Sequence, residues 1–197
     1  MCGIVGVMGD IAWKDEKIFK ELLIVDTVRG PHSTGVAAVK PQGGIGWCKH
    51  ALLPQDLMNM KIFTETMQGT NHALIGHNRY ATKGKVTGFN AHPFDHGDIV
   101  GVHNGTLTNQ RLLPDHEKFE VDSDNIIHSI NEIGVDETIA KLQGAYALVW
   151  HDKVDNSINI IRKEERPLHF CWTEDHSKIW FASESWMLRG VLGWYGS

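Results

Sequence analysis

Apolar residues along this chain follow two patterns, the spacing of helices and the short runs of strands. Helical spacing covers residues 14–29, 54–67, 126–133, 135–142 and 184–192, with Gly30-Pro31 ending the first helix and Ser123 or Asp122 capping the third. Short apolar runs between turn residues predict strands over residues 3–7, 36–39, 45–48, 73–76, 99–102, 145–150, 157–162, 168–172 and 178–182. Because strand-rich blocks enclose helices, we expect an α+β fold of mainly antiparallel sheets covered by helices.

One long segment departs from both patterns. Residues 80–97 are polar and rich in glycine, which predicts a surface loop. Loops of this length within compact domains are often functional.

Composition limits the classes of protein to consider. A chain of 197 residues with 42% hydrophobic residues fits a single domain over residues 1–197. A net charge of -5 without a long charged run argues against nucleic-acid and membrane-surface partners, and the apolar runs are too short to cross a bilayer. Three widely spaced cysteines and no signal-like start favour the reducing cytoplasm.

Cys2 is the first candidate for catalysis, because removal of Met1 leaves a residue with both a thiol and a free α-amine. Unperturbed pKa values of about 8.5 for a thiol and about 8 for an α-amine make this pair a nucleophile with its own base. The alternative is a buried cysteine that packs as a small apolar side chain in the first strand.

Asn104 and Gly105 follow the strand predicted at residues 99–102. A thiolate that attacks an amide creates an oxyanion, and an Asn side-chain amide beside a Gly backbone N–H supplies two donors for it. The same dipeptide is the strongest short-range signal for a hairpin turn. The sequence leaves both interpretations open.

Arg79 and Asp124 are candidates for binding the substrate. An amino-acid amide presents a carboxylate and an ammonium group, which an arginine and a buried carboxylate bind respectively. Arg79 also fits a surface position after a strand, and Asp124 fits the first turn of a helix, where an acid stabilises the dipole. Spacing does not decide between these roles.

The chain contains 12 histidines, and His92, His96 and His103 lie near one another in sequence. No HExxH motif and no paired CxxC motifs occur, and Pro93 disfavours a helix that would align metal ligands. We therefore expect no metal site and no cofactor. His77 fits either an acid-base role or a structural role at the end of a strand.

Together these segments resemble the glutaminase domain of class II glutamine amidotransferases, a family with an N-terminal nucleophile. The resemblance covers nearly the whole chain and rests on the joint order of motifs at residues 1–6, 29–35, 77–82, 90–93, 103–105, 123–124, 142–146, 166–168 and 182–184. It implies a four-layer αββα sandwich and hydrolysis of glutamine to glutamate and ammonia.

The resemblance also implies a role for each residue of the reaction centre. Cys2 attacks the side-chain amide of L-glutamine, while its α-amine moves protons directly or through water. Asn104 and Gly105 hold the oxyanion. Arg29 braces the nucleophile end of the strand, and His77 is a supporting residue.

Substrate-binding roles follow from the same resemblance. Arg79 binds the carboxylate of glutamine, Asp124 binds its ammonium, and Thr82 helps to line the pocket. The chain departs from the family at His32, where an acid is common, and at Lys83, where members acting on sugar phosphates often have histidine. These departures leave glutamine chemistry intact and weaken assignment to a named synthase.

Amidotransferases of this type normally carry an acceptor domain after the glutaminase, and this sequence ends at Ser197. We therefore expect a separate ammonia-acceptor subunit that docks near residues 80–97 or near Trp180, Trp186 and Trp194. The alternative is that all three tryptophans are core residues. Two other functions stay open: an amidohydrolase of γ-glutamyl or other carboxamides, and a catalytically weak regulatory module of the same fold.

Overall fold

The computed structural model describes residues 1–163 and 166–195, whose strands form two separate sheets. The larger sheet has six strands in the order β3-β2-β4-β1-β10-β9, and each neighbouring pair is antiparallel. These strands are β1 (Gly3–Gly9), β2 (Ser33–Val39), β3 (Ile45–His50), β4 (Ala73–Arg79), β9 (His169–Trp172) and β10 (Lys178–Ala182). The hairpin predicted from the turn at residues 41–44 is confirmed as the β2–β3 pair.

The smaller sheet has four antiparallel strands in the order β5-β6-β7-β8. These are β5 (Phe94–His96), β6 (Ile99–Leu107), β7 (Gly144–Asp152) and β8 (Ser157–Arg162). Every strand predicted from the apolar runs is present, and most extend further than the runs indicate.

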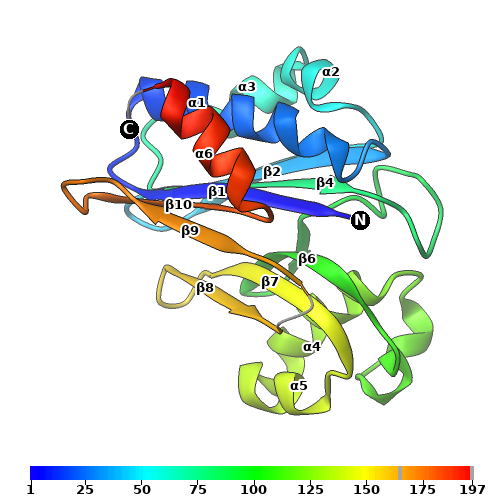
Figure 1. The fold of residues 1–197 in the computed structure, drawn as a ribbon. Coiled ribbons are helices and arrows are strands. Elements are labelled where there is room, and N and C mark those ends of the chain that lie inside the picture. The colour runs from blue at the N-terminus through cyan, green and yellow to red at the C-terminus, as the bar shows by residue number, and fades with distance from the viewer. Residues whose placement is uncertain (164–165, 196–197) are drawn as a thin grey trace.

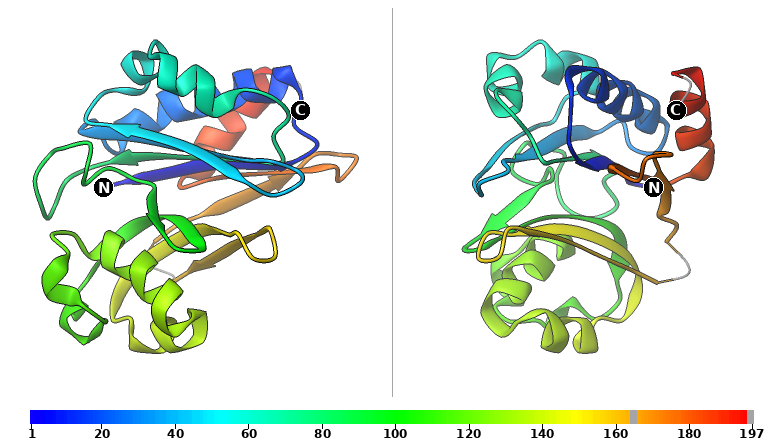
Figure 2. Two further views of the ribbon diagram at one scale, coloured as in Figure 1. Left: turned by 180° about the vertical axis from the view of Figure 1, so that it is seen from behind. Right: turned by 90° about the vertical axis from the view of Figure 1, so that its left-hand side faces the viewer.

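Helices cover the outer face of each sheet, so the molecule has four layers (Figures 1 and 2). The larger sheet is covered by α1 (Trp13–Val25), α2 (Pro54–Met58), α3 (Lys61–Met67) and α6 (Ser185–Trp194). The smaller sheet is covered by α4 (Asp122–Ile133) and α5 (Val135–Lys141), and short 3-10 helices lie at Asp26–Val28, Gln110–Leu112 and His116–Lys118. The predicted α+β sandwich of two antiparallel sheets is confirmed.

Apolar side chains fill the two helix–sheet layers and the space between the sheets. Successive side chains of a strand point to opposite faces. In β1, Val5 and Val7 accordingly pack against the helices, whereas Ile4 packs between the sheets. The same alternation puts Cys2, just before β1, on the face that looks toward the smaller sheet.

Two other strands bring polar side chains to the same region. On β4, Ile75 packs between the sheets, so His77 and Arg79 share its face. On β6, Val102 packs between the sheets, so Asn104 shares its face. The fold therefore gathers side chains from three strands at one end of the space between the sheets.

The helix predicted over residues 54–67 is wrong as a single element. It is divided into α2 and α3, with Met60 in an extended conformation between them. In one straight helix, Leu57 and Phe63 would point about 120° apart. Both are buried in the same apolar layer, and the break lets each of them reach it.

Two predictions around the second sheet are also corrected. The loop predicted over residues 80–97 contains the short strand β5, which pairs with β6. The alternative of an Asn-Gly turn is wrong, because β6 continues through Asn104 and Gly105 to Leu107. Asn104 pairs with Ala147 and Gly105 with Tyr146, so pairing with β7 keeps this dipeptide extended.

Helix ends differ from the predictions by a few residues. The first helix ends at Val25 and continues as the 3-10 helix Asp26–Val28, and the last helix extends to Trp194. Across residues 1–163 and 166–195, every helix is too short or too polar to span a bilayer.

Candidate active site

Cys2 lies directly after the exposed Met1, and its thiol contacts the backbone of Tyr80. The Tyr80 N–H donates to Cys2 Sγ over 3.3 Å, and the thiol donates to the Tyr80 carbonyl oxygen over 3.5 Å. Burial raises the pKa of the Cys2 thiol, while the Tyr80 hydrogen bond, the nearby amino terminus and the Arg79 charge lower it. Burial thus favours the neutral thiol of Cys2, and these neighbouring groups favour the thiolate.

Arg29 fixes the backbone that carries this thiol. Its Nε donates to the Cys2 carbonyl oxygen over 2.9 Å, and its Nη1 forms an ion pair with Glu184. The guanidinium is held at the end of the 3-10 helix that follows α1. These two contacts are what the predicted role of Arg29, bracing the nucleophile end of the strand, requires.

Arg79 is a buried cation at the end of β4. Its Nη1 donates to the Lys85 carbonyl oxygen over 3.0 Å, and its Nη2 donates to the Lys83 carbonyl oxygen. Burial lowers the pKa of Arg79, and no acidic side chain in the described part of the chain forms an ion pair with it. Glu120 and Asp122 act on Arg79 electrostatically without forming an ion pair. A guanidinium that is oriented by carbonyls and has no carboxylate in direct contact is suited to bind an anionic group of a ligand.

Asn104 and Gly105 are consecutive residues near the end of β6. Asn104 is 1% exposed, and its Nδ2 has no hydrogen-bond partner among the described residues. A Cβ atom at Gly105 would lie 2.3 Å from the Ala145 carbonyl oxygen and 2.5 Å from His103 Nε2, so only glycine fits. A buried amide donor without an acceptor carries a desolvation cost that a ligand oxygen can offset.

Three buried histidines lie at the pocket: His92 and His103 line it, and His77 packs against His92. The rings of His77 and His92 lie 3.7 Å apart, and His77 Nε2 donates to the His103 carbonyl oxygen over 3.1 Å. Burial lowers the pKa of all three, that of His77 to about 3, so they are neutral near pH 7. Within residues 1–163 and 166–195, no group of three or more potential ligands could hold a metal ion.

A small pocket brings together four of the residues predicted from sequence. Its wall consists of Cys2, Arg79, Tyr80, Thr82, Lys83, His92, His103, Gly105, Val121, Asp122 and Ser123. Asn104, His77 and Arg29 are buried but do not line the pocket, although Arg29 contacts the Cys2 backbone. Asp124 does not line the pocket, and its Oδ1 lies 2.6 Å from His96 Nε2.

Comparison with known sequences places the chain in a family. The profile of the family described as "Glutamine amidotransferase domain" matches residues 77–190. The chain belongs to this family. The amidotransferase assignment predicted from the motifs is thereby confirmed.

Relatives of this amidotransferase domain include "Glutamine--fructose-6-phosphate aminotransferase [isomerizing]" of Vibrio vulnificus strain YJ016. It is 32% identical over 186 residues, which cover 85% of this chain and 29% of the relative. The protein of that name from Sulfurisphaera tokodaii is 32% identical over 171 residues, covering 76% of this chain and 28% of the relative. The domain thus spans under a third of the length of these relatives.

A solved structure described as the allosteric regulatory enzyme of purine biosynthesis has the same fold. It matches with a TM-score of 0.79 and 22% identity, over 98% of this chain and 43% of that one. At this identity the match supports the four-layer sandwich and carries no argument about substrates.

The sequence identifies some residues around the site of this amidotransferase domain but does not reveal the contacts that they make. His32 Nδ1 accepts the Ala81 N–H over 2.9 Å, which fixes the segment after Arg79. Asp122 accepts the Leu107 N–H over 2.7 Å and the Ser123 N–H over 2.9 Å, so it joins the end of β6 to the start of α4. The sequence predicts Asp122 or Ser123 as a helix cap, which is wrong, because the N-cap of α4 is Val121 and no described side chain caps the helix. The signal that points to Asp122 is its place beside the Ser-Asp motif.

Asp26 is the least expected residue around the site. It is fully buried against Gly3, where an added Cβ would lie 1.9 Å from its Oδ1. Asn78 Nδ2 donates to its Oδ2 over 3.1 Å, and no described residue donates to Oδ1. Burial raises the pKa of Asp26 to about 7, against the smaller opposing effects of Asn78 and Arg29.

Proposed function

We propose that this domain hydrolyses the side-chain amide of L-glutamine to glutamate and ammonia through a thioester on Cys2. The observation that carries the proposal is the unpaired, buried Nδ2 of Asn104 beside the pocket that Cys2, Gly105 and Arg79 share. An unused donor close to a thiol is the arrangement that an oxyanion site needs.

The reaction begins after Met1 has been removed. The α-amine of Cys2 takes the thiol proton, and the thiolate sulfur adds to the amide carbon of glutamine. Asn104 Nδ2 and the Gly105 N–H donate to the oxygen that becomes negative. The tetrahedral intermediate collapses when the amine returns the proton to the leaving nitrogen, which releases ammonia and leaves a γ-glutamyl thioester. Water then cleaves the thioester, and the products are glutamate and the free thiol.

Arg79 and Asp124 select an α-amino acid as the substrate. Arg79 binds the α-carboxylate, because its guanidinium is buried in the pocket wall without a protein carboxylate as ion-pair partner among the residues described. Asp124 follows the pocket residue Ser123 in the first turn of α4, and it binds the α-ammonium through Oδ2, to which no described residue donates a hydrogen bond. Thr82 contributes to the wall beside Arg79.

Ammonia passes to a separate acceptor enzyme or domain. The two relatives named above are aminotransferases of which this domain spans 29% and 28%, which supports an acceptor outside residues 1–197. Trp186 is 47% exposed and Trp194 is 85% exposed, so α6 offers aromatic contact area to a partner. Trp180 is 1% exposed and belongs to the core, which corrects its predicted place on a docking face.

Glutamate release from glutamine tests the proposal, together with an intact mass that reports whether Met1 is lost. We expect Cys2→Ala to lower the rate by more than about 1,000-fold. Cys171→Ala is the matched control, because Cys171 is free and exposed on β9, and it should retain the wild-type rate.

Other outcomes separate the alternatives. A faster Cys2-dependent reaction with γ-glutamyl or other carboxamides identifies an amidohydrolase. A processed protein that hydrolyses none of these amides, alone or with an acceptor enzyme, contradicts the proposal and favours a regulatory module.

A further inference from the structure

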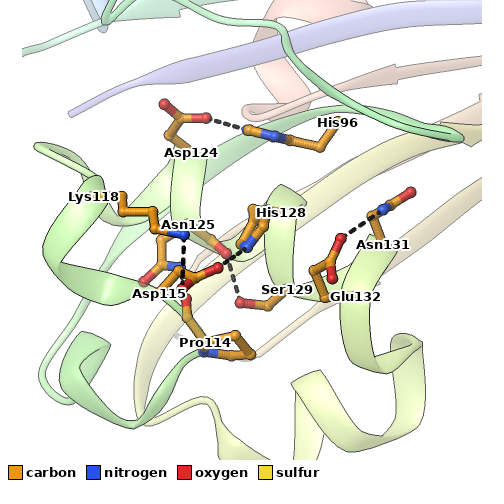
Figure 3. Close-up of polar contacts among 10 residues, drawn as sticks. All are labelled: His96, Pro114, Asp115, Lys118, Asp124, Asn125, His128, Ser129, Asn131 and Glu132. Carbon is orange, nitrogen blue, oxygen red and sulfur yellow. Dashed lines mark hydrogen bonds and ion pairs between the residues drawn. The ribbon is translucent and has the colours of Figure 1, made fainter.

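Asp124, the proposed ammonium ligand, forms a close contact with a histidine that plays no part in the mechanism above. His96 Nε2 lies 2.6 Å from Asp124 Oδ1, between the end of β5 and the first turn of α4 (Figure 3). The side chains are 26% and 10% exposed, so the pair is largely shielded from water. A hydrogen bond to a carboxylate in such a place is stronger than one between neutral groups.

Packing fixes the imidazole of His96 on two sides. Its ring meets Phe119 edge-on with centroids 5.6 Å apart, and it meets His128 edge-on at 5.2 Å. His128 is itself held by Asp115, 3.2 Å from its Nε2, and Asp115 forms an ion pair with Lys118. A ring held in this way loses little entropy when it binds a carboxylate.

The contact uses only one of the two carboxylate oxygens of Asp124. In Figure 3 the other oxygen, Oδ2, points away from His96, and none of the residues described donates to it. Lys49 feels the charge of Asp124, and burial lowers the pKa of Lys49 to about 8, but the two groups form no ion pair. A shielded carboxylate with one free oxygen is suited to a ligand that brings its own positive charge.

We propose that His96 is a positioning residue for the substrate amine. It holds Oδ1 of Asp124, so that Oδ2 is oriented for the α-ammonium of glutamine before the substrate binds. This inference rests on the proposed glutaminase function and adds to it the residue that orients the ammonium ligand. His96 does not touch the substrate and takes no part in proton transfer.

The test compares two amides that differ only in the α-amine, namely glutamine and glutaramate. His96→Phe keeps the ring packing against Phe119 and removes the donor to Asp124. We expect it to raise KM for glutamine about tenfold, the worth of one hydrogen bond to a charged group, with kcat changed by less than about twofold. With glutaramate, kcat/KM should change by less than about twofold, because no ammonium engages Asp124.

Two further variants distinguish positioning from folding. His96→Gln keeps an N–H donor at a similar reach and should restore most of the glutamine KM. His128→Phe alters the neighbouring ring, leaves the His96–Asp124 pair in place and should match the wild type with both amides. An equal loss of kcat/KM with glutamine and glutaramate in His96→Phe would show that His96 has only a structural role. A lower KM for glutamine in His96→Phe would show that His96 competes with the substrate ammonium for Asp124. If the wild type releases no glutamate in a Cys2-dependent reaction, the proposed function itself fails, and the inference fails with it.

Discussion

The space between the two sheets has an apolar part and a polar part, and the same three strands supply both. On β1, β4 and β6, the apolar part contains Ile4, Ile75 and Val102, each no more than 1% exposed. Two positions further along the same faces stand Cys2, His77 and Asn104. On each strand, the apolar core residue and the polar residue of the candidate site are therefore only two residues apart.

The two parts differ in how completely their groups are satisfied. The apolar part needs only close packing, which stabilises the fold through buried area. The polar part retains buried nitrogen atoms without partners among the described residues, at His77, His92, His103 and Asn104. Such groups cost stability. We infer that the apolar part stabilises the domain and the polar part serves binding and catalysis.

The largest stability effect should come from the apolar part. Phe181 is fully buried between the sheets, and Phe181→Ala should lower the free energy of unfolding by about 3–5 kcal/mol. Phe170, its register partner on β9, is 45% exposed, and Phe170→Ala should cost less than about 1 kcal/mol. Urea unfolding measures both, and the rate per folded molecule should stay at the wild-type value. If Phe181→Ala lost glutamate release while its free energy of unfolding stayed unchanged, the assignment of stability to the apolar part and of catalysis to the polar part would be contradicted.

Asp26, next to the nucleophile strand, tests the cost of the buried polar groups. The pKa of Asp26 is about 7 in the folded protein and about 3.9 in the unfolded chain. The contribution of Asp26 to the free energy of unfolding is therefore fully present below about pH 3.9, and it is lost as the pH rises through about 7. Asp26→Asn removes this ionisation. Relative to wild type, the variant should gain roughly 2–3 kcal/mol of unfolding free energy between about pH 5 and pH 8.

Asp155→Asn is the control for this pH series. Hydrogen bonds from Ser157 hold the pKa of Asp155 below its usual range, so this group is ionised in both states above about pH 5. The difference between Asp155→Asn and wild type should therefore stay constant over the series. A constant difference for Asp26→Asn as well would show that its carboxyl group ionises without a penalty.

The sequence predicts the apolar part better than the polar part. Short apolar runs identify every strand of the two sheets except β5, because burial on a sheet imposes a local pattern. The motifs also locate Cys2, Arg79 and Gly105, which the fold brings to one pocket. The contacts of Asp26 with Gly3 and of His96 with Asp124 join residues that are distant in sequence, so no local pattern encodes them. The extended Asn104-Gly105 step depends likewise on β7, which lies some forty residues later.

Arg79 gives a smaller effect that is confined to binding. Lysine has one ammonium and cannot donate to the Lys83 and Lys85 carbonyls while also binding a carboxylate with a planar fork. Arg79→Lys should therefore raise KM for glutamine by about 10- to 30-fold and change the free energy of unfolding by less than about 1 kcal/mol. Steady-state kinetics with urea unfolding checks both, with Arg111→Lys as an exposed control. Arg79 has no ion pair with a protein carboxylate within the described residues, so Arg79→Lys should break no ion pair. A large fall in the free energy of unfolding with an unchanged KM would show that Arg79 supports the fold and does not bind the substrate.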